Sequence, residues 1–466
     1  MALANKDSKI LIVGGGGTIG SSTALHLARR GYTDIRLLDV FQNPSANSAG
    51  NDNNKIAGDD SAGIWGQLGT EAWKMWRTDP VFKDHSHNVG RLDLTSKEIR
   101  EGRLRARYEG IVAEGRGDGV EWLDTKEAIV AKAPHLEKAD LTGWKGLFVK
   151  NGGWVAARDA LNSVGHELRR LGVKSAFGTA GTFDSLILDE ADGRTVRGVR
   201  ASDGTEWLGD LVIMAAGAYS PALIDLENQC ESKAWVYAHI QLTPEEAVEL
   251  KGIPTMYNHE LGFYMEPQPG TGIIKFCNEF GGLTNLTRIK PFGSPTEQLI
   301  SVPRYHALNP TDTIPTEYVL EIQRLIEHCL PHLKGRELQN MAMCWCTDTK
   351  DMNWLMCQHP KYDRLVLATG DSGQTFKMFP VVGKQVADLI EGKLPEERKH
   401  LWRWRPQADD NGTGRGGERP KDLNEVEGWR HDPVVGEEPT SVLGAEAIAR
   451  DGGLSALSPG VAGLRV

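Results

Sequence analysis

The N-terminal part of the chain carries a pattern of apolar and polar positions that predicts a strand, a turn, a helix and a second strand. Residues 9–13, KILIV, form an apolar run typical of a buried strand, and 21–30, SSTALHLARR, repeat with helical periodicity. Gly31 follows as the glycine that ends a helix, and 35–39, IRLLD, predict the second strand. This order is that of a βαβ unit, which spans roughly 30 residues.

The rest of the chain alternates helical and strand patterns without an internal repeat. Glycine, proline and charged residues at 406–420 predict a loop, and the weak pattern near the C-terminus predicts a partly disordered tail. Helical patterns cover most of 59–139, the first part of 154–175, 316–330 and 381–391, and strand patterns cover the end of 154–175, 183–216, 236–300 and 363–368.

Composition and charge exclude several classes of protein. The 466 residues carry a formal net charge of −10, which argues against nucleic acid as a partner because phosphate binding needs clustered lysine and arginine. The 6 cysteines are too few for a disulfide scaffold. The N-terminus has no signal-peptide pattern, the apolar runs fall short of the ~20 residues that cross a bilayer, and the C-terminal LRV is no peroxisomal address. We therefore expect a cytoplasmic protein without a membrane partner.

Residues 15–20 follow the first strand as G-x-G-x-x-G, the pattern of a dinucleotide-binding turn. The first glycine is expected to allow the turn, the second the approach of a pyrophosphate, and the third the packing of the helix on the strand. A carboxylate at the end of the second strand is placed to accept hydrogen bonds from ribose hydroxyls. The motif predicts FAD or NAD without separating them. The expected cofactor contacts here are Gly15, Gly17, Thr18, Ile19, Gly20 and Asp39.

Three further stretches carry groups suited to a cofactor, and each also has an ordinary structural explanation. Residues 48–55, SAGNDNNK, lie beyond the second strand, where a dinucleotide extends, but they equally suit a polar turn. Residues 343–349, MCWCTDT, contain a Cys-x-Cys pair without a second metal-binding pair, and a buried inert thiol is the common alternative. Residues 370–377, GDSGQTFK, offer a second helix N-terminus to a cofactor, or a capping loop.

The chain resembles the fungal fructosyl amino acid oxidases (amadoriases), a group of sarcosine-oxidase-like flavoprotein amine oxidases. The resemblance extends from residue 9 to about 430. It favours FAD over NAD, because in this family the cysteine that matches Cys344 is attached to FAD, and an NAD-dependent dehydrogenase has no use for such a cysteine. The stretches that carry it are ALHLARRGYT, PSANSAGNDNNK, GWKGLF, GFYMEP, IIKFCNEFGGLTN, CWCTDT, QHPKYDRLVLATGDSG and FKMFPVVG.

The resemblance implies how particular residues serve the cofactor. FAD is attached covalently, through its 8α-methyl group, to the cysteine that matches Cys344. Lys275 lies beside the flavin, where its charge helps dioxygen to accept electrons, and Lys55 lies near the same ring. No metal is implied. The further positions implied to bind FAD are Ser48, Asn51, Asp52, Gly217, Asp371, Ser372, Gly373, Thr375, Phe376 and Lys377.

The resemblance also implies the contacts of the substrate. Lys377 and Arg415 match two basic residues that grip a substrate carboxylate. Glu279 matches a glutamate that faces sugar hydroxyls, and Tyr264 belongs to the same implied pocket.

The implied fold is α/β, with a Rossmann-like FAD-binding domain and an α+β substrate domain built on an antiparallel sheet, as in D-amino acid oxidase and sarcosine oxidase. The expected FAD-binding domain is discontinuous and comprises 1–58, 140–235 and 340–400. The expected substrate domain comprises 59–139 and 236–339, followed by a loop at 401–430 that closes the active site and a tail at 431–466.

We predict an FAD-dependent oxidase of the C–N bond of an N-substituted α-amino acid. The amine gives a hydride to the flavin and becomes an imine or iminium, and dioxygen reoxidises the flavin to yield hydrogen peroxide. A small-molecule amine and dioxygen are the expected partners, and the chain is expected to be a monomer or a weak dimer. A protein that binds FAD but is redox-inactive is the alternative to an enzyme.

Departures from the family pattern bear on the substrate. The family's SGRGF is SGQTF at 372–376, and its RGFFFEP is LGFYMEP at 261–267. With the missing peroxisomal tripeptide, these changes favour an N-methyl aromatic amino acid whose iminium cyclises to an isoquinoline in secondary metabolism. Glu279 favours the alternative, a fructosyl amino acid that is deglycated.

Overall fold

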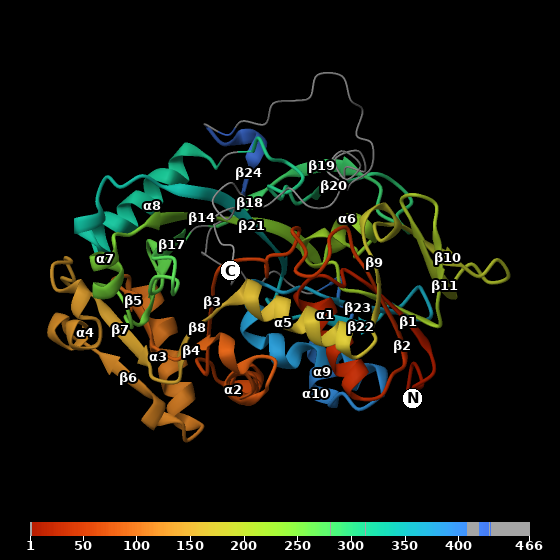
Figure 1. Cartoon of the computed structure of the whole chain (residues 1–466), viewed down its shortest axis with the longest axis horizontal. Coiled ribbons are helices and arrows are strands. Elements are labelled where there is room, and N and C mark those ends of the chain that lie inside the picture. The colour runs from red at the N-terminus through yellow and green to blue at the C-terminus, as the bar shows by residue number, and fades with distance from the viewer. Residues whose placement is uncertain (1, 280, 313, 408–418, 428, 430–466) are drawn as a thin grey trace.

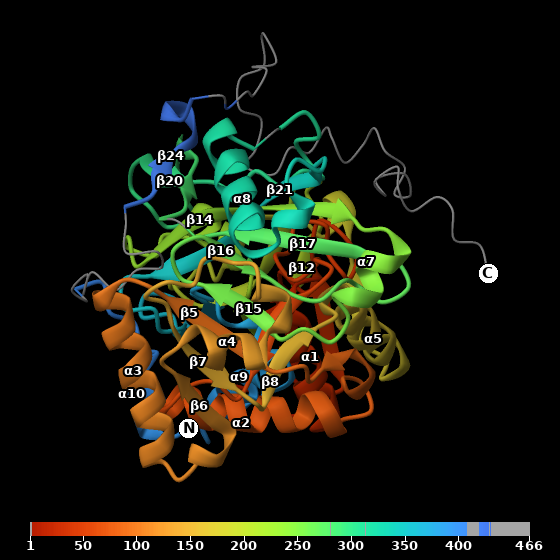
Figure 2. The same cartoon turned by 90° about the vertical axis from the view of Figure 1, so that its left-hand side faces the viewer.

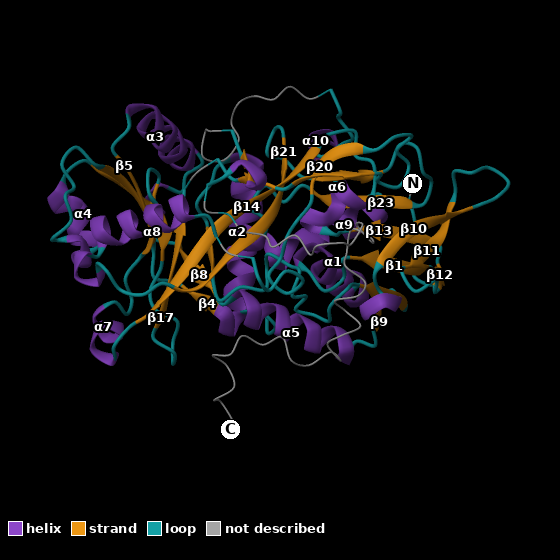
Figure 3. Ribbon diagram, turned by 90° about the horizontal axis from the view of Figure 1, so that it is seen from above, coloured by secondary structure: helices purple, strands orange, loops and turns teal. Residues whose placement is uncertain are grey.

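The computed structural model describes residues 2–279, 281–312, 314–407, 419–427 and 429. A six-stranded sheet and a ten-stranded sheet organise these residues. Seen from above, the six-stranded sheet lies with α1, α5 and α9 in one half of the molecule, and the ten-stranded sheet extends into the other half with α3, α4 and α8 (Figure 3).

The six-stranded sheet has the order β22-β23-β13-β1-β2-β9, and its neighbours pair in parallel except for β22 with β23. Its members come from four separate parts of the chain. They are β1 (Lys9–Val13), β2 (Asp34–Leu38), β9 (Lys174–Ala176), β13 (Leu211–Met214), β22 (Leu355–Gln358) and β23 (Leu365–Thr369).

Alternation along β1 gives this sheet two different faces. Ile10 and Ile12 pack with helices α1, α5 and α9, whereas Leu11 and Val13 pack toward a small antiparallel sheet on the other side. The molecule has three layers here, helices, parallel sheet and antiparallel sheet (Figure 1). The helices are α1 (Thr18–Arg29), α2 (Gly63–Thr78), α5 (Ala157–Arg170) and α9 (Phe379–Ile390), and the small sheet is β10 (Phe183–Leu188), β11 (Val196–Ala201) and β12 (Glu206–Leu208).

The predicted βαβ unit is confirmed. Helix α1 begins at Thr18, three residues earlier than its periodicity predicts, because the last residues of the glycine turn already adopt helical geometry. Gly31 has φ +86°, the left-handed conformation in which a helix commonly ends. Pairing of β1 with β2 runs from Lys9 opposite Asp34 to Val13 opposite Leu38.

The ten-stranded sheet has the order β24-β18-β14-β17-β16-β15-β5-β7-β6, and β21 pairs with β14 beside this path. Helix α8 packs over its strands and α3 along its far end (Figure 2). Its strands are β5 (Arg91–Thr95), β6 (Val120–Leu123), β7 (Lys145–Val149), β14 (Cys230–Gln241), β15 (Thr255–Asn258), β16 (Gly262–Tyr264), β17 (Ile273–Asn278), β18 (Leu283–Thr284), β21 (Gln339–Thr349) and β24 (Lys421–Asp422).

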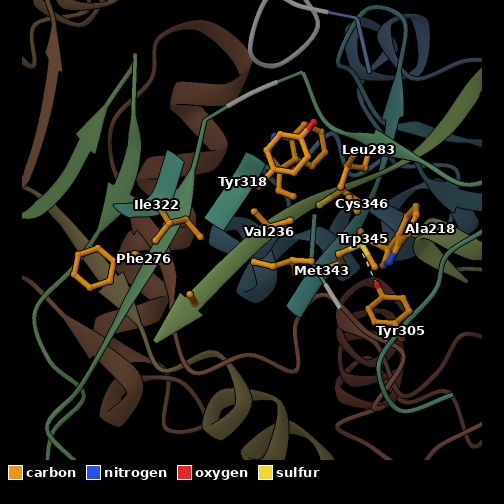
Figure 4. Packing of buried hydrophobic residues seen from close by; sticks show 14 of the residues in the cluster. Ala218, Val236, Phe276, Leu283, Tyr305, Tyr318, Ile322, Met343, Trp345 and Cys346 are labelled. Carbon is orange, nitrogen blue, oxygen red and sulfur yellow. Dashed lines mark hydrogen bonds between the residues drawn. The ribbon is translucent and has the colours of Figure 1, made fainter. Parts of the chain in front are cut away.

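The core of this half is continuous from α8 to β21. Side chains of β14, β17, β21 and α8 interdigitate, and the Tyr305 hydroxyl donates to the Trp345 carbonyl at 3.0 Å (Figure 4). The helices around it are α3 (Glu98–Ala113), α4 (Lys126–Lys132), α7 (Pro244–Glu249) and α8 (Thr316–Cys329). Two smaller sheets lie beside the large ones: β3-β8-β4, with β3 (Lys55–Gly58), β4 (Ser86–His87) and β8 (Gly152–Val155), and the hairpin of β19 (Leu286–Ile289) and β20 (Gln298–Ser301). Two short helices are α6 (Ser220–Leu223) and α10 (Glu396–Leu401).

Residues 59–139 form helices α2, α3 and α4, as their pattern predicts, but they also contribute strands β5 and β6, which the pattern does not show, to the ten-stranded sheet. Strand β5, RLDLT, is buried along its whole length, so its charged positions do not mark a solvent face. Strands β7 and β21 also pair in the ten-stranded sheet, although the expected domain boundaries group them with the FAD-binding part. In the described part of the chain no helix has the length and apolarity that a membrane span requires.

Candidate active site

A cavity of about 560 Å³ lies between the two sheets. This size is within the ~300–1,000 Å³ of small-molecule and cofactor sites. Its wall is built by the β1–α1 turn, the end of β2, the turn after β13, strands β14, β17 and β21, and the loop before α9. The predicted site residues that line it are Gly17, Thr18, Ile19, Asp39, Ser48, Lys55, Gly217, Lys275, Glu279, Cys344, Asp371, Ser372, Gly373, Thr375, Phe376 and Lys377.

Several glycines of the turn after β1 leave no room for a side chain. Gly14 has φ +81°, and a Cβ placed there would lie 2.4 Å from the Ala215 carbonyl oxygen. A Cβ on Gly20 would lie 2.3 Å from the Gly14 oxygen, so α1 packs directly on the turn. The left-handed turn therefore belongs to Gly14, one residue before the position that the motif predicts. Gly17 caps α1 without a side-chain hydrogen bond, which leaves backbone N–H groups for an anion.

Asp39 follows β2 directly and lines the cavity. Its carboxylate accepts hydrogen bonds from the Gly16 backbone N–H at 2.9 Å and the Ser45 hydroxyl at 3.0 Å. Burial raises the pKa of Asp39, and these hydrogen bonds oppose the rise. The carboxylate is thereby fixed beside the glycine turn, where a dinucleotide's ribose is bound in folds of this kind.

The loop that precedes α9 is fastened to β21. Asp371 accepts the Thr347 backbone N–H and the Gly373 backbone N–H, both at 2.9 Å. Ser372 has φ +46°, and its hydroxyl accepts the Thr349 N–H at 3.3 Å. This loop therefore contributes backbone amides and a short helical turn to the cavity wall at a fixed distance from the Cys-x-Cys segment.

Cys344 lies in β21, and its thiol has unusual surroundings. Residues two apart in a strand share a face, so Cys344 and Cys346 lie side by side and both line the cavity. The Lys55 ammonium is 3.4 Å from the Cys344 sulfur. A hydrogen bond from Cys346 and the charge of Lys55 lower the pKa of Cys344 to about 5, against the effect of burial. Cys344 is thus a thiolate at neutral pH, the nucleophilic form of cysteine.

Two lysines share one carboxylate behind the cavity wall. Lys55 Nζ lies 2.7 Å from Asp52 Oδ2, and Lys275 Nζ pairs with the same oxygen. Burial raises the pKa of Asp52, but Lys275 and Lys55 hold it well below its usual range. Asp52 thus contacts the lysines rather than the cavity, and Gly15, Gly20 and Asn51 likewise lie outside its lining.

Lys377, which the sequence analysis singled out, belongs to an alternating chain of charges at the cavity wall whose other members the sequence did not single out. Lys377 pairs with Asp60 at 2.9 Å, and Asp60 also pairs with Arg91. Arg91 binds Asp93 at 2.7 Å, and Arg107 binds the other oxygen of Asp93 at 2.6 Å. Three cations therefore face two carboxylates, and a net positive charge is left for an anion.

The two carboxylates of this chain are stable anions. Burial raises the pKa of Asp60 and of Asp93, but the cations overcome this effect and hold both values below the usual range. Lys377 and Arg91 act on Asp60, and Arg107 and Arg91 act on Asp93.

Glu279 and Tyr257 present polar oxygens to the same cavity. The Tyr257 hydroxyl donates to Glu279 Oε2 at 2.8 Å, and the Tyr257 ring stacks on Phe263 with centroids 5.3 Å apart. The Arg91 guanidinium lies 5.1 Å from the centre of the Tyr257 ring. Glu279 is thus oriented next to the charged chain, where it can accept hydrogen bonds from hydroxyl groups of a ligand.

One predicted substrate contact, Tyr264, does not line the cavity. Tyr264 is fully buried, and its hydroxyl lies 2.9 Å from His135 Nε2 on the other side of β16. Neighbouring residues of a strand point to opposite faces, so Phe263 lines the cavity and Tyr264 does not. Arg415 lies outside the described residues.

Asp60, Arg91, Arg107 and Tyr257 are the functional candidates that the sequence analysis missed. Each is a single polar residue in an ordinary strand, helix or loop, without a motif around it. The one signal was the strict alternation RLDLT in β5, which places Arg91 and Asp93 on one face.

Comparisons with known proteins agree on the class of protein. The model of the DAO family, FAD dependent oxidoreductase, matches residues 9–389. The chain is 30% identical over 412 residues to L-saccharopine oxidase of Schizosaccharomyces pombe, a match that covers 85% of this chain and 93% of that protein.

Solved structures give higher identity. The modified fructosyl peptide oxidase from Aspergillus nidulans is 48% identical, with a TM-score of 0.88, and the match covers 92% of this chain and 100% of that one. The deglycating enzyme fructosamine oxidase from Aspergillus fumigatus, Amadoriase II, is 34% identical with a TM-score of 0.79, covering 92% of this chain and 98% of that one.

Proposed function

The chain belongs to the DAO family of FAD-dependent oxidoreductases, and we propose that it oxidises the C–N bond of a fructosyl amino acid or a short fructosyl peptide. Dioxygen is the electron acceptor, and hydrogen peroxide is the reduced product. The observation that carries the proposal is one cavity that combines a thiolate and two lysines with a Glu–Tyr pair and a net-cationic chain of charges.

The described residues fit FAD. Gly17 at the start of α1 leaves backbone N–H groups for a pyrophosphate, Asp39 is placed for a ribose, and the loop before α9 presents backbone amides. Bound FAD supplies hydride acceptance and electron transfer to dioxygen, which no side chain of the protein provides. Lys275 and Lys55 contribute positive charge to the same cavity, and such charge favours a step in which negative charge develops on dioxygen.

The covalent link to FAD is part of the proposal. Cys344 is suited to it because its thiol lies on the cavity wall and is held as a thiolate by Cys346 and Lys55. Cys346 also lines the cavity but is buried, whereas Cys344 is partly exposed and its sulfur lies 3.4 Å from the Lys55 ammonium, so Cys344 is the stronger candidate. Acid precipitation distinguishes them: flavin should stay with the wild-type pellet and with Cys346→Ala, and should be released from Cys344→Ala.

Substrate chemistry favours a glycated amino acid over an N-methyl aromatic one. Saccharopine and fructosyl amino acids are both secondary amines that bear a carboxylate, and an L-saccharopine oxidase and a fructosyl peptide oxidase both match this chain over most of its length. The carboxylate suits the net positive charge around Arg107, and the sugar hydroxyls suit the Glu279–Tyr257 pair. An N-methyl group offers nothing to that pair, so the isoquinoline-forming substrate has the weaker support.

A substrate screen by peroxide release tests the proposal. The FAD-loaded chain is assayed with fructosyl-valine, fructosyl-valyl-histidine, saccharopine and N-methyl-tyrosine, with unglycated valine as the matched control. We expect fructosyl substrates to exceed the others in kcat/KM by about tenfold or more, since pocket contacts of a few kcal/mol give such ratios. Preferred turnover of N-methyl-tyrosine would overturn the substrate assignment. A yellow protein that oxidises none of these amines would overturn the oxidase assignment.

A further inference from the structure

The carboxylate of Asp52 joins two lysines that arrive from different strands. Lys55 opens β3 and Lys275 lies in β17, yet both ammonium groups pair with Asp52 Oδ2. The side chains of Asp52 and Lys275 are only 5% and 3% exposed. Both lysines line the cavity, whereas Asp52 lies behind its lining. Asp52 therefore acts on the cavity through the lysines.

The position of Asp52 is preset by its own loop. Its Oδ1 accepts the Asn53 backbone N–H at 2.7 Å, which leaves Oδ2 for the lysines. Its carbonyl oxygen accepts the Arg158 backbone N–H at 2.9 Å, and the Asn51 side-chain oxygen accepts Arg158 Nε at 2.7 Å. Arg158 belongs to the first turn of α5, so this helix holds the loop against the ten-stranded sheet.

Charge balance makes Asp52 necessary for both lysines. Burial lowers the pKa of Lys55, but Asp52 raises it well above its ordinary value. His239, opposite Lys275 in the β14–β17 pairing, adds no charge at neutral pH, because burial lowers its pKa to about 4. Among the described residues that face the lysines, Asp52 is the carboxylate. The other titratable or charged groups that face them are Arg158, Tyr237, His239, Cys277, Cys344 and Cys346.

We propose that Asp52 is a positioning residue for the oxidase reaction, which keeps Lys55 charged and aims both Lys55 and Lys275 into the cavity. This inference rests on the proposed oxidase function. Without the carboxylate, burial favours the neutral amine, and two ammonium groups close together repel each other. Lys55 then loses its charge as the pH rises, and Lys275 Nζ loses the oxygen that orients it. Reoxidation by dioxygen needs that charge, whereas hydride loss from the amine does not.

The pH profile of the two half-reactions tests this role, with Asp52→Asn as the isosteric variant. The FAD-loaded enzyme is reduced by substrate without oxygen and is then mixed with dioxygen in a stopped-flow instrument between about pH 6 and pH 10. We expect reoxidation of Asp52→Asn to fall ten- to a hundredfold at the alkaline end and to recover toward wild type on acidification, as ~1.4–2.8 kcal/mol of lost charge stabilisation requires. Substrate reduction should change much less.

Two matched variants separate positioning from folding. Lys275→Met should be slow in reoxidation at every pH, because no proton can restore its charge. Asp52→Glu keeps the charge and should retain the wild-type profile. A pH-independent loss in Asp52→Asn, an equal loss in both half-reactions, or no loss would overturn the proposal.

A measurement without substrate tests whether the lysine paired with Asp52 stays protonated, even if Asp52→Asn does not fold. Wild-type protein is labelled with ¹³C at lysine Cε, and the Lys55 resonance is assigned by its absence in Lys55→Met. Because Asp52 raises the pKa of Lys55 well above its ordinary value, we expect Lys55 to remain an ammonium group up to about pH 10, and a neutral amine at about pH 9 would overturn the proposal. If the enzyme oxidises no amine, the proposed function fails, and this resonance still reports on Asp52.

Discussion

At the scale of single residues, surroundings rather than residue type decide the chemistry. The structure describes six free cysteines, and their thiols are not equivalent. Burial raises the pKa of Cys277, Cys329 and Cys357 to about 12. Cys344 is shifted the other way, to about 5, by Cys346 and Lys55. One thiol on the cavity wall is therefore a thiolate while others of the same chain are inert.

Alkylation of the FAD-free protein checks this difference. Because the pKa of Cys344 is lowered, its reactive thiolate is present above about pH 5 and is lost as the pH falls through that value. We expect iodoacetamide to label Cys344 at neutral pH with an inflection near 5, while Cys277 stays unlabelled. Lys55→Met should move the inflection upward. In the FAD-loaded enzyme the covalent link should block labelling of Cys344. If the FAD-free protein is labelled at Cys344 only in alkaline solution, the assignment of a thiolate is contradicted.

The Glu279–Tyr257 contact gives a second prediction at this scale. Tyr257→Phe keeps the ring that stacks on Phe263 and removes only the hydroxyl that binds Glu279. A hydrogen bond to a charged group contributes about 1.5–3 kcal/mol, so kcat/KM for fructosyl-valine should fall at least tenfold. Steady-state peroxide assays measure the effect. Saccharopine has no sugar hydroxyls, and an equal fall with that substrate would contradict a role in sugar recognition.

At the scale of elements, alternation along strands places side chains in the cavity or behind it. In β16, Phe263 reaches the cavity while Tyr264 packs beside His135. In β5, Arg91 and Asp93 share one face, so one short strand contributes two charges to the same network. The cavity is therefore lined by particular faces of elements, and a shift of one residue in register would exchange those faces.

The β1–α1 turn gives a prediction with a control inside the same element pair. Gly14 and Gly31 both have positive φ, +81° and +86°, but only Gly14 has a backbone atom where a Cβ would lie. Ala at either position costs about 1–2 kcal/mol for the left-handed conformation. We expect Gly14→Ala to lose clearly more unfolding free energy than Gly31→Ala, and to lose FAD as well. Urea denaturation and flavin absorbance measure both, and equal effects in the two variants would contradict the close approach to Ala215.

At the scale of the whole molecule, the charged chain joins parts of the sequence that lie far apart. Lys377 precedes α9, Asp60 follows β3, Arg91 and Asp93 lie in β5, and Arg107 lies in α3. The fold brings these groups to one wall of the cavity and leaves a net positive charge beside Arg107. Such a site is suited to a substrate carboxylate, which a guanidinium can hold through two parallel hydrogen bonds.

Acid and amide forms of one substrate test the charged wall. Arg107→Gln should lower kcat/KM for fructosyl-valine by about tenfold or more and change the amide little, since a charge-assisted hydrogen bond contributes about 1.5–3 kcal/mol. Arg105→Gln is the matched control, because Arg105 lies on the same helix and pairs with the exposed Asp124 instead. Equal losses with acid and amide in Arg107→Gln would contradict carboxylate binding there.

The sequence by itself determined the elements and the cofactor class. Local periodicity marked β1, α1, β2, α8 and α9 nearly at their observed positions, because helix and strand patterns depend on neighbouring residues. The glycine motif, Asp39 and the Cys-x-Cys segment are contiguous signals, and the structure brings them to one cavity. The pattern missed β5 because its buried polar positions resemble those of a charged helical segment, and it missed β6 because that strand is short and carries the exposed Glu121.

Only the tertiary structure decided which single polar residues act together. Asp60, Arg91, Arg107 and Tyr257 carry no local signal, since each gains its role from partners in other elements. The sequence placed Asp52 at the cofactor, whereas the structure shows its carboxylate shared by two lysines, one of them 223 residues away. Burial turns such contacts into strong ones, because a buried charge must find an opposite charge. Which charge it finds depends on how the sheets pack, and no short stretch of sequence encodes that packing.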